Sequence, residues 1–233
     1  MSYCVAIVLA AGRGKRMGRS VPKQFLEIDG KPILYYSLKQ MEDSFVDEII
    51  LVTGESDVNY CQKEIVERFG FRKVSRVVAG GAERYHSVYN GLKAVGHCDF
   101  VFIHDGARPF LDCDILQRNL DMVEQYGACV TGMPVKDTIK ISNAEGFVAE
   151  TPSRDVLWQI QTPQTFRYNI VREAYDRLLV ALESGEVQGT VTDDAMVVER
   201  FGDVSVKLVE GDYRNIKITT PEDLFLAEAF LTT

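Results

Sequence analysis

Residues 4–18 read Cys4-Val-Ala-Ile-Val-Leu-Ala-Ala-Gly-Arg-Gly-Lys-Arg-Met-Gly18. The apolar run Val5–Leu9 is typical of a strand that is buried on both faces of a sheet. The small residues after it allow backbone N–H groups to converge on an anion. Met17 stands where a dinucleotide fingerprint has its third glycine, and the Gly-Lys-Ser/Thr of a Walker A loop is absent. We therefore expect a strand that leads into an anion-binding loop over Gly12–Lys23, with a solvated glycine turn as the alternative.

The charge of the chain is uneven along its length. The net charge of the 233 residues is −8, yet the segment before Glu27 carries only cations, namely Arg13, Lys15, Arg16, Arg19 and Lys23. An acidic protein is a poor general binder of nucleic acid, because a phosphate backbone requires an extended basic face. A local cationic patch suits a small anionic ligand instead, and we expect Arg16 and Lys23 to neutralise a triphosphate.

Length, cysteine content and hydropathy place the chain among ordinary globular proteins. Its 233 residues fit a single domain, 1–233, and 46% of them are hydrophobic. The five cysteines are odd in number, widely spaced and without a Cys-x-x-Cys pair, which favours free thiols in a reducing compartment. The longest apolar run, Cys4–Ala11, is too short to span a membrane, and the N-terminus shows no signal-peptide pattern. We expect a cytoplasmic protein with neither a membrane nor a nucleic-acid partner.

Strand-like and helix-like segments alternate along the first part of the chain. The expected strands are Val5–Leu9, Glu48–Thr53, Val74–Ala79, Phe100–His104 and Cys129–Val135. The expected helices are Ile33–Met41, one ending near Gly70, Glu83–Val95 and Asp112–Tyr126, the last closed by Gly127. This order predicts an α/β fold with a mixed, mostly parallel sheet and helices on both faces. Further on we expect helices at Arg167–Glu183, Asp193–Phe201 and after Pro221, and short strands at Ser205–Val209 and Asn215–Ile218.

The alternation stops after Val135. The segment Thr138–Glu150 reads as two short strands around Asn143–Gly146, which is a β-hairpin pattern. An isolated hairpin is only marginally stable in water. We therefore expect this protruding arm, at about residues 136–156, to pack against a partner subunit.

Polar motifs follow three of the expected parallel strands. Besides the first loop, these are a second glycine turn at Gly80–Ser87 and the segment Asp105–Arg108. Because ligands bind at the carboxyl ends of the strands in such sheets, we expect the three motifs to form one site. Asp105 is the type of ligand that Mg²⁺ takes together with substrate phosphates. A plain strand-to-helix turn at the glycines, and a structural ion pair between Asp105 and Arg108, are the alternatives.

Further polar groups lie nearer the C-terminus. The segment Lys136-Asp-Thr138, with Arg154 and Thr162-Pro-Gln164, lies around the hairpin and is suited to gripping a phosphate monoester, although each residue alone is an ordinary surface residue. Thr192-Asp-Asp194 offers paired carboxylates for metal or acid–base work, or simply a helix cap. Lys217 lies in an apolar segment, so its charge should face an anion.

Eight short motifs together resemble one enzyme family. They occur in order from Leu9 to the C-terminal helix: Leu-Ala-Ala-Gly-x-Gly-x-Arg-Met, Pro-Lys-Gln, Gly-Gly-x-Glu-Arg, His-Asp-x-Ala-Arg-Pro, Lys-Asp-Thr, Thr-Pro-Gln, Thr-Asp-Asp and Asn-Ile-Lys-Ile-Thr. The set resembles the 2-C-methyl-D-erythritol 4-phosphate cytidylyltransferases of non-mevalonate isoprene biosynthesis; the first motif alone marks only the nucleotidyltransferase superfamily. The resemblance implies a Rossmann-like, GT-A-like fold, CTP and methylerythritol phosphate as substrates, CDP-methylerythritol and pyrophosphate as products, Mg²⁺, and a homodimer with interlocking arms.

The resemblance also implies roles for individual residues. The expected catalytic residues, which contact the phosphates of CTP, are Arg16, Lys23 and Lys217. The nucleotide is expected to border Ala10, Ala11, Gly12, Gly80, Gly81, Ser87, Asp105 and Gly106. The acceptor is expected to contact Asp105, Arg108, Thr162 and Thr192, with Thr138 and Arg154 reaching it from the partner subunit. Asp105 is also the expected metal ligand.

Two positions depart from the common pattern of that family. Ala82 stands where an aspartate is frequent beside the base, and Gly106 replaces a frequent alanine. Backbone groups must then do more of the base recognition. The nearest alternative activity is a ribitol-5-phosphate cytidylyltransferase, which shares the fold and the chemistry. The alternatives of other kinds are an NAD-dependent dehydrogenase, against which the missing third glycine argues, and a non-catalytic nucleotide-binding regulator.

Overall fold

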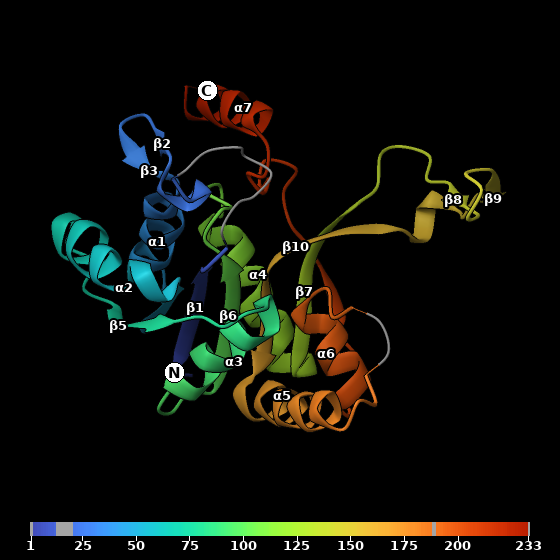
Figure 1. Ribbon diagram of the computed structural model, residues 1–233, viewed down its shortest axis with the longest axis horizontal. Helices are drawn as coiled ribbons and strands as arrows, with labels where there is room; N and C mark the ends of the chain where they lie inside the picture. The colour runs from blue at the N-terminus through green and yellow to red at the C-terminus, as the bar shows by residue number, and fades with distance from the viewer. Residues whose placement is uncertain (1, 13–20, 188–189, 233) are drawn as a thin grey trace.

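A seven-stranded sheet brings the predicted motifs to one edge of the molecule (Figure 1). The computed structural model describes residues 2–12, 21–187 and 190–232, and the sheet lies within these ranges. In sheet order the strands are β11 (Lys207–Glu210), β7 (Ala128–Pro134), β10 (Trp158–Arg167), β6 (Phe100–Asp105), β1 (Cys4–Ala10), β4 (Glu48–Thr53) and β5 (Val74–Ala79). The neighbours from β6 to β5 are parallel, so the carboxyl ends of β1, β5 and β6 face the same side. The predicted α/β fold with a mostly parallel sheet is confirmed.

Strand β10 was not expected from the sequence. It runs antiparallel between β6 and β7, and it carries Thr162, Pro163 and Gln164 into the middle of the sheet. The prediction that these residues lie around the hairpin is therefore wrong. Polar residues and a proline argue against a central strand, but the pairing with β7 shifts between Ile160 and Gln164, and such an irregularity removes the need for a ladder hydrogen bond from Pro163.

Helices cover both faces of the sheet. One face carries α1 (Ile33–Asp43), α4 (Cys113–Tyr126) and the π-helical segment η4 (Cys61–Glu67), which continues α2 (Val58–Tyr60). The other face carries α3 (Arg84–Ala94), α5 (Tyr168–Glu183) and α6 (Asp194–Phe201). The last helix, α7 (Pro221–Leu231), packs with the small hairpin β2 (Glu27–Ile28) and β3 (Lys31–Pro32) on a third, smaller core.

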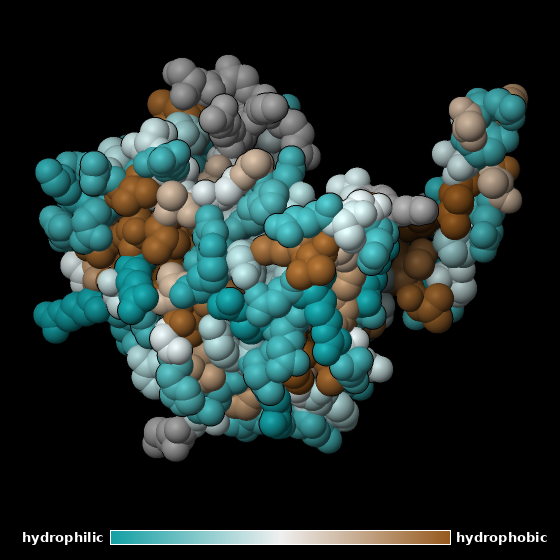
Figure 2. All heavy atoms as spheres, turned by 60° about the horizontal axis from the view of Figure 1, so that its bottom comes forward, coloured by the Kyte–Doolittle hydropathy of each residue, from teal (hydrophilic) through white to brown (hydrophobic). Residues whose placement is uncertain are grey.

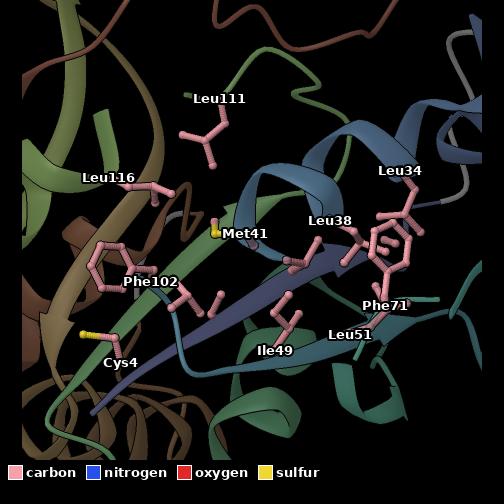
Figure 3. Close-up of a cluster of buried hydrophobic side chains, with 14 of the residues drawn as sticks. Cys4, Leu34, Leu38, Met41, Ile49, Leu51, Phe71, Phe102, Leu111 and Leu116 are labelled. Carbon is pink, nitrogen blue, oxygen red and sulfur yellow. The ribbon is translucent and has the colours of Figure 1, made fainter. Parts of the chain in front are cut away.

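The two large cores follow from the period of two along each strand. Ala6 and Val8 of β1 point into the first core, whereas Val5 and Ile7 point into the second, and all four are fully buried. Figure 3 shows the first core, where side chains of α1 pack against those of the sheet, Phe102 among them. Burial of each such side chain stabilises the fold by about 1.5–3 kcal/mol. The strand ends that carry the motifs are therefore held on a rigid base.

Several helix ends are fixed by the predicted residues. The side chain of Asp112 accepts a hydrogen bond from the backbone of Ile115 at the start of α4, and Gly127 closes that helix with a φ of 80°. Asp193 caps α6 by accepting from Met196. The prediction of a strand at Asn215–Ile218 is wrong, because the backbone there forms isolated hydrogen bonds, such as Ile218 N–H to the carbonyl of Ala107, and no ladder.

A hairpin arm projects from the ends of β7 and β10, at the right of Figure 1. Its two short strands, β8 (Ile141–Ser142) and β9 (Val148–Glu150), pair only with each other in the described chain. Phe147 is 71% exposed and Val156 is 76% exposed, and Figure 2 shows apolar side chains on the surface of the arm. Among the described residues, no helix is both long and apolar enough to cross a membrane.

Candidate active site

The ends of β1, β5 and β6 meet at short distances. A Cβ atom built on Gly80, after β5, would lie 2.7 Å from the Cβ of Ala11, after β1. The N–H of Gly106, after β6, donates to the carbonyl of Leu9 at 2.9 Å. The side-chain amide of Gln24 donates to the carbonyl of Ala10 at 2.5 Å and so ties the Pro-Lys-Gln motif to the end of β1. Three of the motifs predicted to form one site are therefore in contact.

The second glycine turn is held by Ser87 of α3. The hydroxyl of Ser87 accepts a hydrogen bond from Gly81 N–H at 3.0 Å and donates to the carbonyl of Glu83 at 3.3 Å. A Cβ atom on Gly80 would lie 2.6 Å from this hydroxyl, so only glycine fits there without a shift of its neighbours. Ser87 thus braces the turn that faces the loop after β1.

A cationic pocket of about 320 Å³ lies beside this turn, where β6 and β10 meet the segment before α6. It is lined by Asp105, Arg108, Thr162, Thr192 and Lys217, which are all predicted site residues, and by Arg84. The pocket lining does not include Thr138 or Arg154. Both are exposed on the arm, where the Arg154 guanidinium donates to the carbonyl of Lys136 at 3.3 Å.

Asp105 is the centre of the charge network in the pocket. Lys217 Nζ lies 2.7 Å from its Oδ2, Arg108 Nε lies 4.0 Å from the same oxygen, and Arg84 Nε lies 3.6 Å from its Oδ1. Burial alone would raise the pKa of Asp105, but the charges of Arg84, Lys217 and Arg108 outweigh it and hold the pKa well below its usual range. The carboxylate is therefore ionised, and three cations surround it.

Arg84 is held from behind by a second carboxylate. Its two terminal nitrogens donate to both oxygens of Asp194 at 2.8 and 2.7 Å, and the hydroxyl of Tyr175 donates to Asp194 Oδ1 at 2.5 Å. Burial would lower the pKa of Arg84, but the charges of Asp194 and Asp105 raise it well above its usual value. Sequence reasoning gave Arg84 no role. Its partner Asp194 lies 110 positions away in the sequence, so no local pattern pointed to this pair.

A chain of hydrogen bonds fixes the backbone at Asp105. Its N–H donates to the hydroxyl of Thr162 at 3.0 Å, and that hydroxyl lies 3.1 Å from Nδ1 of His104. The carbonyl of Arg108 lies 3.2 Å from Nε2 of His104 and can only accept, so Nε2 carries the hydrogen; Nδ1 of the neutral ring then accepts from the Thr162 hydroxyl. Burial lowers the pKa of His104 to about 4, so the ring is neutral and holds the Asp105–Arg108 segment in place. Thr162 thus supports the site in two ways, because it lines the pocket and its hydroxyl holds the backbone of Asp105.

The predicted phosphate-binding lysines lie close together. Lys23, in the 3-10 turn η2 (Lys23–Phe25), donates from Nζ to the carbonyl of Ile218 at 2.8 Å, one residue beyond Lys217. A larger open cavity of about 790 Å³ lies against Ala11, Gly12 and Pro22, with residues 54–57 as its opposite wall. Arg16 lies outside the described residues.

The donors present are compatible with a divalent cation that substrate phosphates help to hold. Among the described residues no group of three or more His, Cys, Asp or Glu could bind a metal ion by itself. The pocket offers the ionised carboxylate of Asp105, and Asp193 also lines it. Mg²⁺ is commonly bound by one or two carboxylates plus phosphate oxygens, so this donor set fits that ion and no self-sufficient site is required.

Comparison with known proteins adds the family. A model of the 2-C-methyl-D-erythritol 4-phosphate cytidylyltransferase family matches residues 4–233. Relatives with that name include a protein of Lachnoclostridium phytofermentans, 50% identical over 99% of this chain and 97% of its own, and one of Clostridium perfringens, 48% identical over 99% of this chain and 100% of its own.

Solved structures agree with this result. The crystal structure of a 4-diphosphocytidyl-2C-methyl-D-erythritol synthase from Anaerococcus prevotii has a TM-score of 0.85 and 34% identity, covering 100% of this chain and 97% of that one. That of a 2-C-methyl-D-erythritol 4-phosphate cytidylyltransferase from Thermus thermophilus has a TM-score of 0.78 and 30% identity, covering 100% of both chains. The full-length matches and the cationic pocket at the strand ends agree, and this chain belongs to the 2-C-methyl-D-erythritol 4-phosphate cytidylyltransferase family.

Proposed function

We propose that this protein transfers the cytidylyl group of CTP to 2-C-methyl-D-erythritol 4-phosphate and releases pyrophosphate. The observation that carries the proposal is the pocket in which Arg84, Arg108 and Lys217 surround Asp105, in a chain that matches this family along its whole length. Such a pocket attracts a phosphate monoester and places it beside the loop after β1. Isoprene biosynthesis is the route that this reaction serves.

The chemistry requires positioning and charge more than a strong base. A phosphate oxygen of the acceptor attacks the α-phosphorus of CTP, a new P–O bond forms, and the bond to the bridging oxygen breaks so that pyrophosphate carries away the negative charge. The acceptor phosphate is already a nucleophile at neutral pH. The protein must therefore align it and stabilise charge on the leaving group, and cations at fixed positions do this.

We assign the phosphates of CTP to Arg16, Lys23 and Lys217. Two contacts support this assignment: the Lys23 ammonium donates to the carbonyl of Ile218, the neighbour of Lys217, and Pro22, the residue before Lys23, lines the cavity that borders Gly12. We assign the nucleoside to Ala10, Ala11, Gly12, Gly80 and Gly81, with Ser87 bracing the glycine turn, and its ribose side to Asp105 and Gly106. The close packing of Gly80 against Ala11 supports this assignment, because it brings the glycine turn and the end of β1 side by side.

We assign the acceptor to the pocket lined by Asp105, Arg108, Thr162 and Thr192. Thr138 and Arg154 complete it from the partner subunit of a homodimer. Their exposure on a projecting arm with an apolar surface supports this arrangement, because such an arm is suited to packing against a second copy.

Two further assignments accompany the reaction. Mg²⁺ would be held by Asp105 and the triphosphate, and when bound it neutralises charge on the phosphates that are being separated.

We place the protein in the cytoplasm, because an odd number of widely spaced cysteines suits a reducing compartment.

The test is pyrophosphate release from CTP and Mg²⁺ with methylerythritol phosphate or ribitol 5-phosphate offered separately. Release with methylerythritol phosphate only is the expected result. Release with ribitol 5-phosphate only would keep the chemistry and change the acceptor. CTP binding without release in either mixture would leave a nucleotide-binding protein and contradict the proposal.

A further inference from the structure

We propose that Arg84 is a positioning residue for Asp105, and that Asp194 and Tyr175 form the clamp that holds it. The inference rests on the proposed function, because it assigns residues that act behind the site described above. Arg84, Asp194 and Tyr175 come from α3, α6 and α5, so the clamp joins three helices at one point beneath the pocket.

The clamp fixes the plane of the guanidinium. Both terminal nitrogens of Arg84 are used in a bidentate pair with Asp194, whose side chain is completely buried. Asp194 is in turn fixed by the hydroxyl of Tyr175, which is also completely buried. A guanidinium is planar and cannot turn without breaking a bidentate pair. The third nitrogen, Nε, is therefore held toward the pocket, 3.6 Å from Asp105 Oδ1.

The two oxygens of Asp105 have different neighbours. Oδ2 faces Lys217 and Arg108, whereas Oδ1 faces Arg84. A carboxylate with cations on one oxygen only would rotate to suit them. Arg84 opposes that rotation, so it sets the direction in which Oδ1 is presented to the pocket. A lysine at position 84 would keep the charge but would lack the fork that makes the direction fixed.

The backbone that carries Asp194 is itself held by the sheet. The side-chain oxygen of Gln164, in β10, accepts from the N–H groups of Asp194 and Ala195 at 3.0 and 2.7 Å. Its amide nitrogen donates to Asp193 at 2.9 Å. The clamp therefore stands on a central strand, and the same contacts hold the segment that brings Thr192 to the pocket.

The first test is a double-mutant cycle on kcat/KM for methylerythritol phosphate at saturating CTP and Mg²⁺. Arg84→Ala should lower kcat/KM roughly 10- to 100-fold, and Tyr175→Phe should lower it less. In the Arg84→Ala background, Tyr175→Phe should have no further effect, because its hydroxyl then has no guanidinium to position. Equal effects of Tyr175→Phe in both backgrounds would overturn the inference, since a purely structural tyrosine acts independently of Arg84.

Two controls separate positioning from stability. Tyr168→Phe removes a tyrosine hydroxyl from the same helix. That hydroxyl donates to the carbonyl of Leu92 at 3.0 Å, at the opposite end of α3 from Arg84. This variant should keep the wild-type kcat/KM. Guanidinium added to Arg84→Ala should restore part of the activity, because Arg84 lines an open pocket, and it should not stimulate the wild type. Loss of activity in Tyr168→Phe equal to that in Tyr175→Phe would contradict the inference.

A crystal structure of Asp194→Asn, or of Tyr175→Phe if the first variant does not fold, tests the same point without activity. The distance from Arg84 Nε to Asp105 Oδ1 should exceed the 3.6 Å of the native chain, with the guanidinium turned. An unchanged position would overturn the inference whatever the enzyme does. An inactive wild type, by contrast, would refute only the proposed function, and the crystal structure would still decide this point.

Discussion

At the scale of single residues, the site is built around one carboxylate and three cations. Asp105 is kept ionised by Arg84, Lys217 and Arg108, and none of these contacts involves a strong base or an activated nucleophile. This balance suits a reaction in which phosphates must be gathered and charge must be absorbed. It also means that one cation can be removed while Asp105 keeps two others, so that the fold survives the change.

Lys217→Ala should therefore lower turnover by about 10²-fold or more while the protein stays folded, by analogy with the removal of one charge-stabilising donor. The measurement is steady-state pyrophosphate release with thermal unfolding as the check on the fold. Lys93→Ala is the matched control, because Lys93 is an exposed lysine over the ring of Tyr89 on the outside of α3. Near-wild-type turnover of Lys217→Ala would refute the role of Lys217.

His104 gives a prediction for the dependence of stability on pH. Its pKa falls from 6.5 in the unfolded chain to about 4 in the buried site, so the unfolded state binds more protons between these values. The contribution of neutral His104 to the free energy of unfolding is fully present above pH 6.5. It should fall by up to about 3 kcal/mol as the pH drops toward 4. The lowered pKa of Asp105 acts only below its ordinary value of 3.8, hence in a separate window.

Urea unfolding of the metal-free protein between pH 7.5 and 4.5 measures this loss. His104→Gln, which keeps a donor toward the carbonyl of Arg108, should be less stable at pH 7.5 but should lose less stability over the same range. Parallel curves for the two proteins would show that another group carries the pH dependence.

At the scale of elements, the sequence predicts most of the sheet and little of what crosses it. The runs at β1, β4 and β6 are largely apolar, so a buried parallel strand is the simplest structure for them. β10 has polar residues and Pro163 at its centre, and only the polar partners supplied by its neighbours make it stable there, such as Asn119 and Thr131. Asn215–Ile218 shows the opposite error, because it was predicted as a strand but is not one. Its residues make isolated contacts instead, such as those of the Asn215 side chain with Gln161 and Thr162.

The same distinction applies to the candidate site. The strand-end motifs could be placed together, because a mostly parallel sheet brings the carboxyl ends of its strands to the same edge whatever their order. The pair between Arg84 and Asp194 joins residues 110 positions apart and depends on how α3 and α6 pack across the second core. No spacing in a single sequence encodes such a contact, and the Asp-Asp motif therefore kept several interpretations.

Gly80→Ala should disturb the turn after β5 and lower kcat/KM for CTP. The new methyl group would lie 2.6 Å from the Ser87 hydroxyl and 2.7 Å from Ala11, so both must move, at a cost of about 1–3 kcal/mol. Gly96→Ala is the control, because no atom lies within 4 Å of a Cβ at that position. Equal kinetics and stability of the two variants would contradict the close approach of the turn to the loop after β1.

At the scale of the whole molecule, the arm and the pocket belong to different parts of the surface. Thr138 and Arg154 lie outside the pocket lining of their own chain, although they carry the side-chain types that a phosphate monoester needs. A second copy is the arrangement in which the arm gains a packing surface and the pocket gains two more ligands. In a dimer with twofold symmetry each contact occurs twice, so each arm would contribute to the site of the other subunit.

The double variant Phe147→Asp with Val148→Asp should therefore dissociate the proposed homodimer. Phe147 is 71% exposed and Val148 is 63% exposed on a hairpin whose strands pair only with each other within the described residues, and in the proposed dimer each new carboxylate would enter the apolar interface twice. Sedimentation velocity at micromolar concentration should give the monomer mass of 26.2 kDa for the variant and twice that mass for the wild type. KM for the acceptor should rise in the monomer, because Thr138 and Arg154 no longer reach a partner.

Phe225→Asp provides the control, since Phe225 of α7 is 74% exposed but lies off the arm, and it should leave the dimer intact. Dissociation by Phe225→Asp but not by the arm variant would place the interface on α7 and refute the arm as the site of assembly.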